Sequence, residues 1–73
     1  MKKEKYLQEI KENLTSLNCS DFKKLWNNVF QEEKIDEVDK DGKDDLSELL
    51  LEEMVYFEKE RLIKVHKFIE KRM

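Results

Sequence analysis

The chain has 73 residues, of which 15 are Lys or Arg and 18 are Asp or Glu, so its net charge is −3 at pH 7. A chain this short holds one domain, whose core rarely supplies more than about 3–5 kcal/mol without a staple or a partner. The single cysteine excludes an intramolecular disulfide, and no apolar run approaches the roughly 20 residues of a membrane span. The N-terminal residues lack the apolar run of a signal peptide, so we expect a cytoplasmic protein.

Proline is absent and Gly42 is the only glycine, so little in the chain opposes helix formation. We expect an all-helical protein with one domain over residues 1–73, a compact antiparallel bundle of four to five short helices. The first helix is expected from Lys2 to Leu17, because its apolar residues recur every three or four positions. These residues are Tyr6, Leu7, Ile10, Leu14 and Leu17.

A second helix is predicted after the interruption at residues 18–20. Ser20 is a suitable N-cap, and Asp21 is favourably placed against the helix dipole. The apolar stripe that follows is uninterrupted, and we expect Trp26 and Phe30 in the core rather than on a ligand-binding surface. The stripe consists of Phe22, Leu25, Trp26, Val29 and Phe30.

The connection that follows is charged apart from Ile35 and Val38, whose spacing predicts a short helical turn that fixes it to the core. Residues 39–42 predict a chain reversal, because Asp and Gly tolerate left-handed conformations. The next helix is then expected to begin at about Asp45, where Glu48 completes a capping box. Its expected core residues are Leu46, Leu49, Leu50, Met54 and Phe57.

A last apolar stripe points about a third of a turn away from the preceding one. It consists of Leu62, Val65, Ile69 and Met73. Two interpretations remain open: a break near residues 58–61 starts a separate helix, or one long helix over residues 46–72 meets two different neighbours.

Residues 37–48 match imperfectly the twelve-residue calcium loop D-x-[DN]-x-[DN]-G-x5-E. Glu37 takes the place of the first Asp, and Asp44 occupies the eighth position, which is normally apolar. We therefore interpret the segment as a solvated acidic turn that caps a helix, and expect calcium affinity no better than millimolar. The oxygen ligands of such a loop would come from Asp39, Asp41, Asp45 and Glu48.

Cys19 and His66 are the remaining candidates for chemistry. A thiol at a helix start can be activated, but the chain offers a single histidine and no third partner for a Cys/His nucleophile. We expect Cys19 to be a packed thiol and His66 to lie at the edge of the core, with Glu70 as its only ligand-type neighbour at helical spacing. We predict no catalytic, cofactor or metal site and no enzymatic activity.

The charges are distributed unevenly along the chain. Residues 35–53 hold nine acidic side chains and two lysines, whereas residues 54–73 hold six Lys or Arg and three Glu. Such asymmetry bears on partners rather than on fold. The basic stretch offers contacts to phosphates, but a pI near 5.2 and the acidic segment would repel nucleic acid. We therefore expect a protein partner, without nucleic acid and without a membrane.

The order of the elements resembles the death-fold superfamily of adaptor domains. The resemblance is carried by residues 14–25 (LTSLNCSDFKKL), the pair Ile35 and Val38, residues 42–50 (GKDDLSELL) and residues 57–62 (FEKERL). It covers about residues 7–72 and rests mostly on apolar spacing. The closest similarity is to prokaryotic effector-associated domains and, more loosely, to pyrin domains, whose second helix opens with a similar Asp-Phe-Lys segment.

The resemblance implies a signalling or defence adaptor that associates with itself or a homologous domain through opposed charged surfaces. The acidic surface would consist of Asp44, Asp45, Glu48 and Glu52, and the basic surface of Lys64, Lys67, Lys71 and Arg72. The alternative is a small inhibitor or immunity-type protein, such as an antitoxin or phage-encoded blocker, whose acidic face masks a basic site on an enzyme. An adaptor should form homo-oligomers or bind like domains, whereas an inhibitor should form a one-to-one complex with an unlike target.

Overall fold

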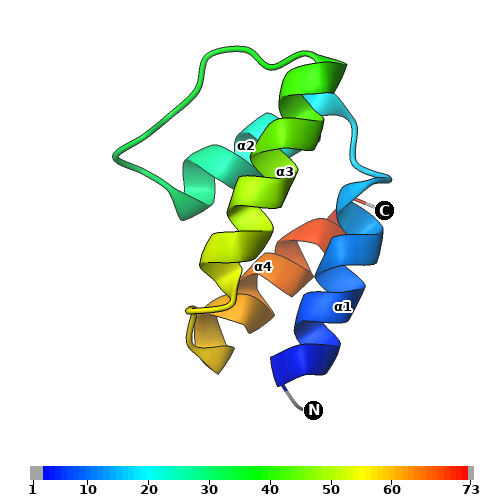
Figure 1. Cartoon of the computed structure of the whole chain (residues 1–73), viewed down its shortest axis with the longest axis vertical. Helices are drawn as coiled ribbons and strands as arrows, with labels where there is room; N and C mark the ends of the chain where they lie inside the picture. Colours follow the sequence, from blue (N-terminus) through cyan, green and yellow to red (C-terminus); the bar gives the residue numbers. More distant parts are fainter. Residues whose placement is uncertain (1–2, 73) are drawn as a thin grey trace.

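The computed structural model describes residues 3–72, which fold into four helices and contain no strand (Figure 1). The helices are α1 (Lys3–Leu14), α2 (Cys19–Val29), α3 (Lys40–Met54) and α4 (Lys59–Lys71). The predicted all-helical class is confirmed, with four helices. None of them combines the length and the apolar composition needed to cross a bilayer.

The four helices form two helix–turn–helix units, α1–α2 and α3–α4, with the same turn geometry. We call each unit a hairpin, although its two helices pack mainly against the other unit rather than against each other. Each turn is closed by three backbone hydrogen bonds, and the bonds of the second turn repeat those of the first forty residues later. In the first turn the bonds run from Ser16 N to Asn13 O, from Leu17 N to Leu14 O and from Phe22 N to Asn18 O. In the second turn they run from Tyr56 N to Glu53 O, from Phe57 N to Met54 O and from Leu62 N to Glu58 O. The second turn separates α3 from α4, so of the two interpretations left open by the sequence, the separate helix is correct and the single long helix is wrong.

Burial follows the same repeat. The equivalent buried positions of the two hairpins are Ile10 and Leu50, Leu14 and Met54, Leu17 and Phe57, Phe22 and Leu62, and Leu25 and Val65. Both hairpins direct these side chains into one core, in which α1 packs mainly against α4 and α2 contacts both α3 and α4. In Figure 1, α2 and α4 pass behind α3, while α1 lies to one side of it. The core therefore depends on both hairpins.

Trp26 is 6% exposed, as predicted, and its indole Nε1–H donates to the carbonyl of Glu33 at 2.9 Å. It belongs to a chain of aromatic rings in which its centroid lies 6.3 Å from that of Phe22 and 4.5 Å from that of Phe30. The Phe30 ring in turn lies 6.5 Å from that of Phe57 in the second turn. Aromatic contacts thus join the two hairpins.

The starts of α2 and α3 differ from the predictions. Helix α2 is capped by Asn18, whose Oδ1 accepts from the amide of Asp21 at 2.7 Å, and not by Ser20. Helix α3 is capped by Asp39, whose Oδ1 accepts from the amide of Gly42 at 2.6 Å, and not by Asp45. Capping by Asp39 makes residues 40–42 the first helical turn, so the predicted reversal at residues 39–42 is wrong. No residue of the described part of the chain, Gly42 included, needs a positive φ.

Around Ile35 and Val38 the connection forms no helical turn, contrary to the prediction; its hydrogen-bonded turn lies earlier, where the Glu33 amide donates to the Phe30 carbonyl at 3.0 Å. Asn27 holds it instead, because its Nδ2 donates to the carbonyl of Ile35 at 3.0 Å and its Oδ1 accepts from the Ile35 amide at 2.7 Å. Ile35 and Val38 are half-buried against the core, as expected. A side-chain amide thus provides the backbone partners that a helical turn would have supplied.

Two further details of the predicted helices need correction. Helix α1 ends at Leu14 and Leu17 lies in the following turn, although it is buried as predicted. Leu49 was expected in the core but is 51% exposed. At about 100° per residue it lies roughly a third of a turn from the line of Leu50 and Met54. Met73, expected to end the last apolar stripe, lies outside the described residues.

Candidate interaction surfaces

The predicted acidic residues form one exposed stripe along α3. Asp44, Glu48 and Glu52 are four residues apart and therefore follow one another along the same side of the helix, with Asp45 beside them. All four are exposed, and within residues 3–72 none lies within 4 Å of a cationic side chain. We call these residues the acidic stripe. Its carboxylates are free to meet cations from outside the chain.

Lys43 is the charged residue of α3 that points inward. It is 8% exposed, and its Nζ donates to the carbonyl of Thr15 in the first turn at 3.3 Å. This contact ties α3 to the first hairpin. Lys40 and Lys43 both precede the acidic stripe, so α3 has no lysine beyond Lys43 that could neutralise the carboxylates on its outward face.

The predicted basic residues behave as two groups. Lys64, Lys67 and Lys71 are exposed and share one side of α4, and we call them the basic stripe. Arg72 is engaged within the fold: its Nε lies 3.6 Å from Asp21 Oδ1, and its guanidinium lies 4.0 Å from the centre of the Phe68 ring. The three lysines are therefore the more available cations.

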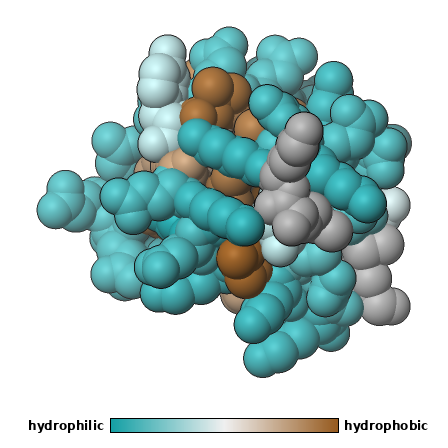
Figure 2. Space-filling view, turned by 90° about the horizontal axis from the view of Figure 1, so that it is seen from below, coloured by the Kyte–Doolittle hydropathy of each residue, from teal (hydrophilic) through white to brown (hydrophobic). Residues whose placement is uncertain are grey.

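A shallow apolar groove of about 280 Å³ lies between α1 and α3. Leu7, Leu51 and Val55 line it, and Val55 is 53% exposed. Its polar edge is formed by Glu4, Gln8 and Lys11 of α1. Figure 2, which views the molecule from the end where α3 passes into α4, shows apolar side chains in a strip between hydrophilic ones. The sequence interpretation assigned no role to Leu51 and Val55.

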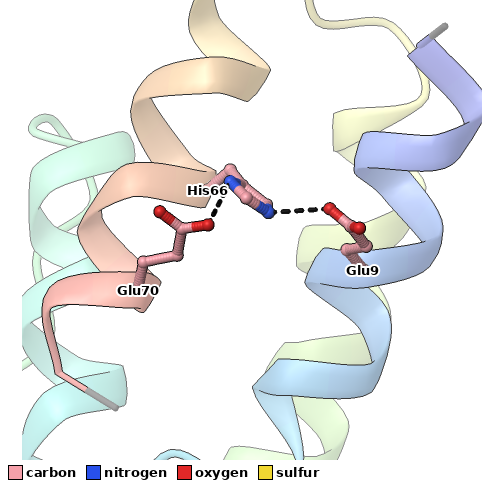
Figure 3. A network of polar contacts seen from close by, with 3 residues as sticks. All are labelled: Glu9, His66 and Glu70. Carbon is pink, nitrogen blue, oxygen red and sulfur yellow. Dashed lines mark ion pairs between the residues drawn. The ribbon is translucent and has the colours of Figure 1, made fainter. Parts of the chain in front are cut away.

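His66 joins α1 to α4 (Figure 3). Its Nε2 lies 2.8 Å from Glu9 Oε2 of α1, and its Nδ1 lies 3.3 Å from Glu70 Oε1 of α4. The Tyr6 ring meets the imidazole edge-on, with centroids 5.5 Å apart. A neutral imidazole has one N–H for two carboxylates, whereas the protonated ring donates to both. Periodicity indicated Glu70 but could not indicate Glu9, which lies on another helix.

Glu9, His66 and Glu70 do not have the geometry of a metal centre. No group of three or more His, Cys, Asp or Glu side chains with metal-binding geometry occurs among residues 3–72. The suggested calcium loop is also not formed, because α3 begins at Lys40 and the last nine of the twelve positions are helical. Asp39 uses its carboxylate to cap α3 rather than to face a cation. Cys19 is half-buried at the first residue of α2, and both nitrogens of His66 face carboxylates instead of the thiol.

A second, larger groove of about 740 Å³ lies where α2 ends beside the start of α4. Arg61 occupies part of it: its Nη2 donates to the carbonyl of Val29 at 3.0 Å, and its guanidinium lies 3.9 Å from the centre of the Phe57 ring. A cation in this position satisfies the end of α2 and interacts favourably with its dipole. Glu58, Glu60 and Lys64 give the remaining walls charges of both signs, so this groove favours no single class of ligand.

No family model, no curated protein and no solved structure matches this chain.

Proposed function

We propose that this protein is a non-enzymatic interaction module that associates with a second copy of itself or a homologous domain, as in the death-fold-like adaptors it resembles. The observation that carries the proposal is the pair of exposed stripes of opposite charge on different helices, α3 and α4. The acidic stripe of one molecule meets the basic stripe of the next. Complementary potentials of this kind steer encounter and select partners.

The two stripes differ, so the contact is heterologous and leaves one free stripe of each sign on a pair. Rings or filaments are the expected products at high concentration. Each exposed ion pair contributes only about 0–1 kcal/mol and is screened over about 8 Å at physiological salt. The association is therefore expected to be weak, dependent on concentration and sensitive to salt.

Light scattering coupled to size separation tests the proposal. At about 20 mM salt, where the screening length is roughly 20 Å, the average mass should rise above the 9.0 kDa monomer as protein concentration increases. At about 0.5 M salt the mass should return to that of the monomer. A monomer at every concentration and salt would contradict self-association.

A second candidate function is supported by the acidic stripe alone. Its four carboxylates lack cationic partners among the described residues, so the stripe can also cover a basic site on an unlike enzyme. An inhibitor of this kind needs no basic stripe. Charge reversal on α3 would then abolish the complex, whereas charge reversal on α4 would leave it unchanged.

A further inference from the structure

The apolar groove lies directly beside the acidic stripe. Val55 is the C-cap residue that follows α3 with helical backbone angles, and it lies seven residues after Glu48. This separation is close to two helical turns, so the two residues face the same side. Leu51 lies between Glu48 and Glu52 along the helix. The α3 edge of the groove is therefore acidic, and Glu4 adds a carboxylate from α1. Two cations oppose these charges: Lys11, which lines the groove, and Lys3, whose Nζ donates to the carbonyl of Val55 at 2.7 Å.

Charge alone gives this surface little binding energy, because exposed ion pairs are worth so little. Burial of apolar area is the main source of affinity in most associations. Val55, about half exposed, offers such area in the groove, next to the stripe that selects a basic partner. The groove therefore suits a helix that carries lysines and an apolar side chain on the same face.

Helix α4 of this chain presents that combination. Ile63 is half-buried and lies one turn before Lys67, on the flank of the basic stripe. We propose that the groove lined by Leu7, Leu51 and Val55 receives α4 of a second copy of this chain, with Ile63 against Val55 and the basic stripe along Glu48 and Glu52. This inference rests on the proposed self-association and names the apolar contact at its centre.

The test compares a substitution at Val55, directly after α3, with one at Leu49 within α3. Val55→Gln and Leu49→Gln make the same chemical change at residues that are 53% and 51% exposed, but only Val55 lines the groove. Val55→Gln should weaken association by about five-fold, the loss expected when half a valine side chain can no longer be buried. Leu49→Gln should change it by less than about two-fold. Equal effects of the two substitutions would overturn the groove as the docking site.

The salt dependence of association distinguishes the contribution of the groove from that of the charged stripes. The factor lost in Val55→Gln should be the same at low and moderate salt, whereas the factor lost on reversing charges in the stripes should shrink as salt rises. If charge reversal abolishes association while Val55→Gln has no effect, the groove is excluded and the proposed function stands. If the wild-type chain does not associate, both fail. Far-ultraviolet circular dichroism checks that each variant folds, and Val55→Ala replaces Val55→Gln if that variant does not.

Combining Ile63→Gln with Val55→Gln tests whether Ile63 of a second copy occupies the groove. Ile63→Gln should weaken association about as much as Val55→Gln. If the two side chains touch across the contact, the chain with both changes should lose less than the product of the two single factors. Factors that multiply would show that Ile63 does not occupy the groove.

Discussion

Trp26 contributes to the fold in two ways at once. Its ring is 6% exposed among other aromatic side chains, and its Nε1–H satisfies the carbonyl of Glu33, where the connection leaves α2. We expect Trp26→Ala to lower the free energy of unfolding by about 3–5 kcal/mol, which would unfold most of a domain this small. Thermal or urea unfolding followed by circular dichroism measures the effect.

Trp26→Phe is the matched control for the same position. It keeps an aromatic ring but removes the donor to Glu33, so we expect a loss well below that of Trp26→Ala. A Trp26→Ala variant that unfolds as cooperatively and at the same temperature as the wild type would show that this side chain is a surface contact.

The two carboxylates that face His66 should contribute unequally to stability. Glu9 joins α1 to α4 at 2.8 Å, whereas Glu70 lies 3.3 Å away within the last turn of α4. We expect Glu9→Ala to cost about 1 kcal/mol, because it removes the contact between two helices. Glu70→Ala should change stability by less than about 0.5 kcal/mol, since the charge it removes opposes the helix dipole at that end. Equal costs in chemical unfolding would contradict this assignment.

At the scale of the helices, Asp39 determines where α3 begins. Asp39→Ala removes the acceptor for the amide of Gly42 and should cost about 1 kcal/mol. Asp39→Asn retains a side-chain oxygen and should recover most of this loss. Asp45→Ala, at the N-cap expected from the sequence, should have little effect, because Asp45 lies inside the helix. A larger loss for Asp45→Ala than for Asp39→Ala in unfolding experiments would place the helix start at the later residue.

The sequence predicted the central part of each helix, since periodic apolar residues report which face of a helix is buried. It also predicted a helical turn at Ile35 and Val38 that does not form. It did not locate the helix starts, because Asn18, Ser20, Asp39 and Asp45 are all acceptable N-caps by residue type. The choice depends on tertiary contacts such as Lys43 with Thr15, which extends the buried face of α3 towards its start. Single-sequence patterns contain no information on such contacts.

The candidate surfaces were also predictable only in part. Exposure of the acidic and basic stripes followed from their helical spacing, as residues opposite an apolar stripe face water. The groove and the Glu9–His66 contact were missed because each needs two helices to be placed against one another. The run Leu49 to Leu51 illustrates the difficulty: three consecutive leucines on one helix face three directions, and only Leu50 is fully buried.

At the scale of the whole molecule, two equivalent hairpins carry unlike outer surfaces. The second hairpin holds the acidic stripe on its first helix and the basic stripe on its second, while the first hairpin supplies α1 as one wall of the groove. Both hairpins are therefore needed to form the proposed contact. This division predicts that an isolated second hairpin, which lacks Leu7 and half of the core, neither folds nor associates.

The most direct measurement of the central claim is association between two charge-reversed variants. The first variant carries Asp45→Lys and Glu48→Lys, so it retains only its basic stripe. The second carries Lys64→Glu and Lys67→Glu, so it retains only its acidic stripe. Each has lost one half of the contact and should be a monomer in light scattering at low salt.

An equal mixture of the two variants combines an intact basic stripe on the first with an intact acidic stripe on the second. Our account predicts that this mixture associates at low salt, while each variant alone stays monomeric, and that added salt dissociates the mixed complex. A mixture that remains monomeric under conditions in which the wild type associates would contradict the pairing of α3 with α4 of another copy.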